Sequence, residues 1–159
     1  MRKVICGRNL TPQSRLEGGC RLDALFPMPS RLAYTTLLID DYDRAIAYFT
    51  QVLGFQVRAD ERLSATKRWV VVAPSGAGGA LLLAQASTPA QRALVGGQGG
   101  GRVWLFLHTD DFAAEHARLS ACGVRFEESP RDEPYGRVAV FVDCWGNRWD
   151  LVQPSGAAA

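Results

Sequence analysis

The chain contains two copies of one sequence pattern, and this repeat restricts the possible fold more than any other feature. Each copy has a strand-like run, then two aspartates and an aromatic residue, then a helix-like segment that ends near a glycine. The strand-like runs are 32–39 and 103–108, and the repeated motifs are Asp40-Asp41-Tyr42 and Asp110-Asp111-Phe112. Because internal self-similarity reflects repeated structural units, the sequence predicts two modules with the same βαβββ order.

In each copy the paired aspartates can cap a helix, because their carboxylates accept hydrogen bonds from the first free backbone N–H groups. In the first module, Gly54 is expected to end the helix in a left-handed conformation. In the second module, Gly123 has the same expected role. Apolar side chains recur at helical spacing in both segments, which predicts one buried face per helix: Tyr42, Ile46, Phe49 and Leu53, then Phe112, His116 and Leu119.

Further strand-like runs complete each module. The first module is expected to continue with strands at 55–61, 68–73 and 80–85, and the second with a strand at 124–127 and the closing hairpin. Between the modules, Thr88-Pro89 is typical of a helix start, and residues 96–101 then contain five glycines. This glycine run neither follows a strand nor opens a helix, so it lacks the context of a phosphate-binding or dinucleotide-binding loop. We expect a flexible connector over 88–102, with a hinge or flap as the alternative.

The closing hairpin, residues 136–154, places a single carboxylate, Asp150, in its second strand. Strand alternation puts Arg148 and Asp150 on one face, so that face is not an ordinary dry core. A two-residue turn at Gly146-Asn147 would set Asp143 opposite Asp150, where like charges repel. A longer turn is therefore expected, with Asp143 capping it through its side chain and Gly146 or Asn147 in the left-handed conformation.

Composition sets the broad class of the protein. A length of 159 residues with 47% hydrophobic and 21% charged residues fits one domain, expected at 31–154, with a flexible extension at 1–30 and a disordered tail at 155–159. The net charge of +2, without a basic stripe between aromatics, argues against nucleic acid, and no apolar run is long enough to span a membrane. Four cysteines without CxxC or metal-finger spacing, and without a preceding secretory segment, predict reduced thiols in a cytoplasmic protein.

Three motifs together resemble the vicinal oxygen chelate (VOC) superfamily, which includes glyoxalase I, extradiol dioxygenases and the fosfomycin- and bleomycin-resistance proteins. They are the helix segment 40–49, the Leu53-Gly54-Phe55 helix end and the closing segment 142–151. The resemblance covers about residues 32–153. It implies an α+β fold in which two βαβββ modules form a curled mixed sheet around a cup. It also implies a homodimer, because a second subunit usually completes or buttresses the cup.

The resemblance also provides a test for a metal site. Metal-dependent members place His or Glu ligands at positions that match Tyr34, Leu82, Trp104 and Asp150 in this chain. Only Asp150 is an ordinary metal ligand, whereas divalent ions in such sites need several carboxylate or imidazole groups. His108 shares a face with Trp104 but lies about 13 Å further along the strand. We therefore expect no metal cofactor, with an atypical divalent site as the alternative.

The cup is expected to hold an aromatic pocket with one anionic and one cationic group. Such a site suits a flat or cationic organic molecule, so we expect a metal-free small-molecule-binding protein in which Asp150 is the charge partner. One alternative is a VOC-type lyase, isomerase or dioxygenase with Asp150 and His108 as acid and base, and another is a non-catalytic structural or interaction domain. A further alternative is that Asp150 only pairs with Arg148 or Arg137 and has no chemical role. The expected ligand-binding residues are Tyr34, Thr36, Trp104, Phe106, His108, Arg148 and Asp150.

Overall fold

The computed structural model describes residues 31–76 and 78–156, and the described residues from Leu32 onward belong to one compact unit. The expected extension at 1–30 lies outside the described residues, as do residues 157–159 of the expected tail. Ser155 donates hydrogen bonds to the carbonyl oxygens of Tyr135 and Pro134 at 3.0 Å each, which anchors the chain just after the last strand. No helix among the described residues is long and apolar enough to cross a membrane.

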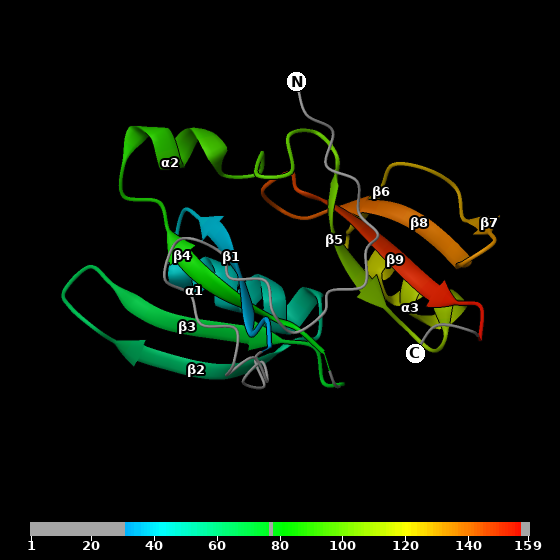
Figure 1. The fold of residues 1–159 in the computed structure, drawn as a ribbon, viewed down its shortest axis with the longest axis horizontal. Coiled ribbons are helices and arrows are strands. Elements are labelled where there is room, and N and C mark those ends of the chain that lie inside the picture. The colour runs from blue at the N-terminus through cyan, green and yellow to red at the C-terminus, as the bar shows by residue number, and fades with distance from the viewer. Residues whose placement is uncertain (1–30, 77, 157–159) are drawn as a thin grey trace, which may run out of the picture. The chain divides into compact units, whose positions relative to one another are not determined.

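The first module forms a four-stranded sheet with the order β1-β4-β3-β2 (Figure 1). β1 and β4 are parallel, whereas the other neighbouring strands are antiparallel. Its helix begins as an α-helix and continues as a π-helical segment, which the sequence did not predict. The elements are β1 (Tyr34–Ile39), α1 (Tyr42–Ala47), η2 (Tyr48–Val52), β2 (Gln56–Arg62), β3 (Arg68–Ala73) and β4 (Ala80–Gln85).

The second module repeats this order after the short helix α2 (Pro89–Leu94). Its sheet has the order β5-β9-β8-β6, with β7 also paired to β8, and β5 is parallel to β9. The prediction of an α+β fold with two βαβββ modules is confirmed, and each module has its own sheet. The elements are β5 (Val103–His108), α3 (Phe112–Ala121), β6 (Arg125–Phe126), β7 (Arg131–Glu133), β8 (Gly136–Val142) and β9 (Arg148–Pro154).

The helix ends follow the predicted capping chemistry. The carboxylate of Asp41 accepts a hydrogen bond from the Arg44 N–H at 2.9 Å, and that of Asp111 accepts one from the Ala114 N–H at 3.0 Å. Gly54 follows the first helix with φ of 71°, in the left-handed region that favours glycine. These features set where each helix begins and ends relative to its sheet.

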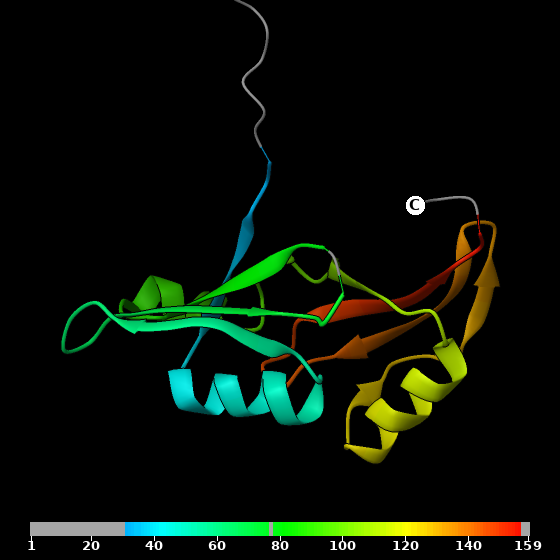
Figure 2. The same cartoon turned by 90° about the horizontal axis from the view of Figure 1, so that it is seen from below.

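In each module the helix that follows the first strand, α1–η2 or α3, covers one face of its own sheet, and the two modules share one hydrophobic core (Figure 2). Alternate residues of the strands point into this core, including Leu37 of β1, Leu107 of β5 and Leu151 of β9. Aromatic contacts join the modules: Phe49 of η2 stacks on Trp145 with ring centroids 6.0 Å apart. The Trp145 indole N–H also donates a hydrogen bond to Asp40 at 2.8 Å, although 105 residues separate the two in sequence.

The turn of the closing hairpin is built around Asp143, as predicted. Its Oδ1 accepts hydrogen bonds from the backbone N–H groups of Trp145, Gly146 and Asn147 at 2.9–3.0 Å. Its Oδ2 accepts one from Asn147 Nδ2 at 2.9 Å and one from the Trp149 indole at 3.1 Å. Gly146, with φ of 106°, is the left-handed residue. The longer turn keeps Asp143 away from Asp150, which lies opposite Val140 instead.

The glycine-rich connector packs against both modules, which differs from the expectation of a flexible link. A Cβ on Gly96 would lie 1.8 Å from the carbonyl oxygen of Trp145, so the connector touches the hairpin turn directly. The Gln98 side chain accepts a hydrogen bond from the Leu38 N–H at 2.6 Å and donates one to the Thr36 carbonyl at 3.2 Å. Its amide therefore satisfies backbone groups along the edge of β1, in place of a neighbouring strand.

Candidate functional site

The seven predicted ligand-binding residues lie on the sheet faces opposite the helices, which we call the helix-free faces. On β1, β5 and β9 the intervening residues, such as Leu37, Leu107 and Leu151, point into the core beneath the helices. The structure divides the predicted set between the two sheets, and no hydrogen bond or ring contact joins the two groups within the described residues. Tyr34 and Thr36 belong to the first sheet, and Trp104, Phe106, His108, Arg148 and Asp150 belong to the second.

Asp150 is the most unusual of these residues, because its carboxylate is buried. Only 5% of the residue is exposed, and its Oδ1 has no hydrogen-bond partner among the described residues. Burial raises the pKa of Asp150 above its ordinary value, and the positive charge of Arg131 partly opposes this shift. A buried acceptor without a hydrogen-bond partner lowers the stability of the fold. A hydrogen-bond donor or a positive charge placed next to Asp150 would therefore be favourable.

Neither arginine expected from the sequence pairs with Asp150. Arg148 donates to Glu127 at 2.6 Å and also to the carbonyl of Gly101. Arg137 lies 3.9 Å from Asp132, and its guanidinium carbon is 5.5 Å from the centre of the Phe112 ring. The alternative that Asp150 pairs with Arg148 or Arg137 is therefore not realised in the structure.

The cation that acts on Asp150 is Arg131, which the sequence did not single out. It lies on β7, a strand of only three residues, and forms ion pairs with Glu133 at 2.9 Å and with Glu128. These two acids hold the Arg131 guanidinium, so its charge reaches Asp150 only as an attraction without a hydrogen bond. A three-residue strand gives too little alternation to be recognised from sequence, and no other signal marks Arg131.

Aromatic side chains on the helix-free faces remain accessible. Phe106 is 62% exposed beside Asp150, and Tyr34 is 45% exposed in the first sheet. Tyr34 meets Trp69 edge to face, with ring centroids 6.0 Å apart. Trp104 is partly buried and packs against the shared core. The two sheets thus present separate aromatic surfaces, each suited to stacking against a flat molecule.

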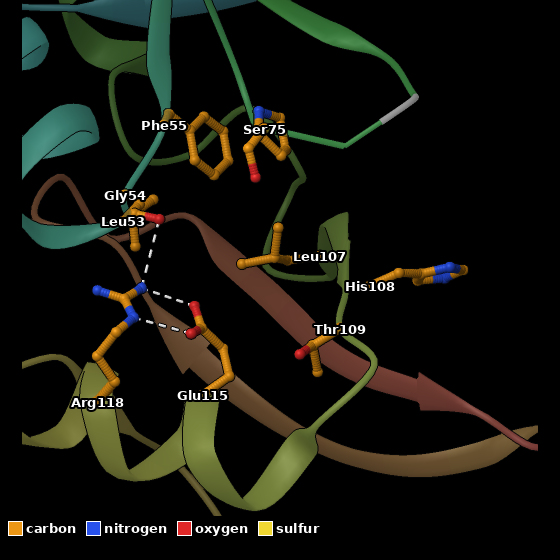
Figure 3. A pocket seen from close by; sticks show the side chains of 10 residues that line it. Leu53, Gly54, Phe55, Ser75, Leu107, His108, Thr109, Glu115 and Arg118 are labelled. Atoms are coloured by element: carbon orange, nitrogen blue, oxygen red, sulfur yellow. Dashed lines mark hydrogen bonds and ion pairs between the residues drawn. The ribbon is translucent and has the colours of Figure 1, made fainter.

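A pocket of about 330 Å³ lies between the modules at the end of β5 (Figure 3). Arg118 of α3 donates to the carbonyl oxygen of Val52 at 2.8 Å and pairs with Glu115 at 2.6 Å, which ties the end of η2 to the second module. The His108 imidazole points away from the other labelled side chains. Asp150 does not line this pocket, and no hydrogen bond joins it to His108 within the described residues, so the structure assembles no acid–base pair from them.

The donor set does not resemble a metal centre. Among residues 31–76 and 78–156, no group of three or more His, Cys, Asp or Glu side chains is placed to hold a metal ion. The four positions matched to metal ligands fall on two different sheets, and Asp150 supplies the only carboxylate among them. His116 packs instead between Phe112 and Phe126, with ring centroids 5.6 Å and 4.0 Å away, in the structural position that its helix face predicted.

Comparison with known proteins assigns the family. Residues 31–151 match the family model of the Glyoxalase/Bleomycin resistance protein/Dioxygenase superfamily. The chain belongs to this superfamily. The predicted VOC resemblance is therefore confirmed, and the two-sheet architecture described above is this superfamily's fold in this chain.

Relatives in sequence and structure extend over most of the chain. An uncharacterized protein of Shewanella frigidimarina is 44% identical over 128 residues, which cover 79% of this chain and 95% of that protein. The crystal structure of TnmS3, an antibiotic binding protein from Streptomyces sp. CB03234, has a TM-score of 0.64 and 32% identity, covering 80% of this chain and 98% of TnmS3. The crystal structure of UcmS2 has a TM-score of 0.67 and 30% identity, covering 79% and 98% of the two chains.

Proposed function

We propose that the protein binds a small organic molecule without a metal, and that the ligand is flat and positively charged. In this proposal the ligand stacks on Phe106 and directs its positive charge to Asp150. One observation carries the proposal. A carboxylate that is 95% buried, with one oxygen that has no hydrogen-bond partner among the described residues, lies beside an aromatic ring that is mostly exposed. The relationship to TnmS3, an antibiotic binding protein, supports ligand binding as the general role.

The chemistry of Asp150 favours a cationic ligand over a neutral one. Burial penalises the charged form of a carboxylate, and a cation that arrives within hydrogen-bond distance reverses this penalty. Arg131 attracts Asp150 but donates no hydrogen bond to it, because its guanidinium is paired with Glu128 and Glu133, and its buried Nη1 has no hydrogen-bond partner among the described residues. A planar cation would also gain from the exposed face of Phe106, since aromatic rings attract positive charge.

We further propose that the protein is a homodimer. Tyr34 and Phe106 are both exposed, and they lie on different sheets of the same chain. A second copy that sets one of its sheets against the opposite sheet of the first would cover both rings and close the site around a ligand. Light scattering coupled to size-exclusion chromatography tests this proposal: a mass of twice the 17.3 kDa chain supports it, and a monomer at micromolar concentration contradicts it.

Thermal shift measurements with planar aromatic cations test ligand binding. Stabilisation grows as RT ln(1 + [L]/Kd), so micromolar affinity gives a clear shift at millimolar ligand. Phe106→Ala should remove the shift, whereas Leu94→Ala, which removes a half-exposed apolar side chain from α2, should leave it unchanged. A shift that survives Phe106→Ala places the ligand elsewhere. If no planar cation produces a shift, the structural-domain alternative is favoured.

Elemental analysis of the purified protein tests the metal-free part of the proposal. After growth and dialysis in the presence of divalent metals, we expect no stoichiometric zinc or transition metal, because the matched positions offer one carboxylate where such ions need about three or four ligands. One bound metal per chain would instead favour the enzyme alternative.

A further inference from the structure

A second pocket, of about 240 Å³, lies where the glycine-rich connector meets the ends of β8 and β9. Neither Asp150 nor Phe106 lines it, although Arg148, one of the seven predicted ligand-binding residues, does. Its walls come from four parts of the chain that are distant in sequence. The lining residues are Gly96, Gly99, Gly101, Arg102, Arg125, Glu127, Val142, Gly146, Asn147 and Arg148.

The lining side chains carry a net positive charge. Three guanidinium groups face one carboxylate, so their net charge is +2. Glu127 is shared by two of them, at 2.6 Å from Arg148 and 3.5 Å from Arg125. Arg102 has no ion-pair partner among the described residues, and its five N–H donors remain available for a planar or tetrahedral anion.

The connector contributes space to this pocket. Gly99 cannot carry a side chain, because a Cβ there would lie 2.7 Å from the carbonyl oxygen of Arg102 and 2.9 Å from the Cβ of Trp104. Glycines at this wall let the backbone approach closely and keep the volume open. The glycine run still does not open a helix, so any anion here would be held by arginine side chains, without a helix N-terminus.

Asn147 contributes an acceptor that is unpaired among the described residues, and an anion that carries no proton cannot form a hydrogen bond with it. It is only 3% exposed, and its Nδ2 donates to Asp143 at 2.9 Å, which fixes the orientation of the amide. Its Oδ1 is therefore an acceptor, and it has no hydrogen-bond partner among the described residues. A ligand that satisfies the whole pocket brings negative charge for the arginines and a hydroxyl donor for Asn147.

We propose that this pocket binds a phosphate group that also presents a hydroxyl donor. Orthophosphate meets both requirements at neutral pH, because it keeps at least one P–OH group. A phosphate monoester loses its last P–OH with a pKa of about 6, so it meets the second requirement only when its carbon skeleton carries a hydroxyl next to the phosphate. The proposal is independent of ligand binding at Asp150.

Isothermal titration of the full chain with orthophosphate and with sulfate at mildly alkaline pH tests this proposal. Orthophosphate is there mainly the singly protonated dianion, so it shares the shape and charge of sulfate, which has no proton. We expect saturable orthophosphate binding with Kd below about 1 mM at low ionic strength. Sulfate should bind at least about tenfold more weakly, since it leaves the Asn147 acceptor unpaired. Arg102→Ala should weaken orthophosphate binding by a similar factor, whereas Arg62→Ala, at an exposed position of β2, should not.

Two phosphate monoesters, glycerol 3-phosphate and methyl phosphate, then test whether the natural ligand is a monoester or the free ion. Tighter binding of glycerol 3-phosphate than of orthophosphate, with methyl phosphate weak, assigns the pocket to a hydroxylated monoester. Binding of orthophosphate alone assigns it to the free ion. Equal affinity for orthophosphate and sulfate, or orthophosphate binding that is unchanged by Arg102→Ala, overturns the proposal. Asp150→Asn should leave all of these affinities unchanged, which keeps this result separate from the test of the aromatic site.

Discussion

Phe106 and Asp150 occupy paired positions on the parallel strands β5 and β9 and share one face of the sheet, although 62% of the phenylalanine and only 5% of the aspartate is exposed. A flat molecule that stacks on the ring therefore comes to lie next to the strand position that carries the buried carboxylate. The partner of Asp150 on its other side is Val140, which offers no polar group. The exposed ring of Phe106 and the buried carboxylate of Asp150 are therefore neighbours on one face of the sheet.

Asp150→Asn should change the pH dependence of stability. The pKa of Asp150 is raised in the folded state, so the native protein binds more protons than the unfolded chain between the two pKa values, and its free energy of unfolding falls as pH rises through that window. The asparagine variant lacks this loss, so its stability relative to the wild type should increase with pH, by about 1.4 kcal/mol for each unit of pKa difference. Urea unfolding from acidic to neutral pH measures this, and Asp132→Asn on β7 controls for charge removal. A variant less stable than wild type at neutral pH would show that Asp150 makes stabilising bonds.

Asp143→Ala should destabilise the protein strongly. The Asp143 carboxylate accepts five hydrogen bonds, three from backbone N–H groups of the turn and two from the side chains of Asn147 and Trp149. Its removal leaves buried donors without partners, which should cost about 3 kcal/mol or more in chemical denaturation. A loss below about 1 kcal/mol would mean that water replaces these bonds.

Gly96→Ala should destabilise the protein by about 2 kcal/mol or more, because a Cβ would overlap the Trp145 carbonyl and the backbone φ is 77°. Gly97→Ala is the matched control. A Cβ on Gly97 would make only an ordinary contact, 3.8 Å from the Leu94 carbonyl oxygen, so the Gly97→Ala variant should be close to wild type in stability. Equal stability of the two variants would show that the connector does not pack closely on the hairpin.

Arg118→Ala should weaken the contact between the modules. Its guanidinium donates to the Val52 carbonyl of the first module and to Glu115 of its own helix, at a partly exposed position. We expect a loss of about 1 kcal/mol in unfolding free energy. Arg92→Ala, at an exposed position of α2, should lose less, and equal losses would argue against the bridging role of Arg118.

Much of the fold was predictable because its signals are local. The repeated aspartate pairs gave both N-caps, Gly54 and Gly123 marked the ends of the helices, and repulsion between Asp143 and Asp150 excluded a two-residue turn. Strand alternation also placed Arg148 and Asp150 on one face of the last strand. Each of these inferences depends on residues close together in the chain, where spacing alone determines geometry.

The missed features depend on contacts between distant segments. Arg131 acts on Asp150 from a strand too short to show alternation, and Gln98 reaches β1 across 60 residues. The arginine pocket joins the connector to β6 and β9, so no stretch of sequence contains its pattern. The seven predicted residues lie on two sheets, and the packing between the two modules determines whether the two groups meet. Local spacing in the sequence does not show this packing.

The most direct test of the central claim compares a fixed planar cation with a neutral ligand of the same shape. N-methylacridinium and acridine form such a pair at mildly alkaline pH. We predict that titration calorimetry gives tighter binding of the cation by at least about tenfold in wild type and in Asp132→Asn, and that Asp150→Asn abolishes this preference while neutral acridine still binds. Equal affinity for the two ligands in wild type, or a preference that survives Asp150→Asn, would contradict the assignment of Asp150 as the charge partner.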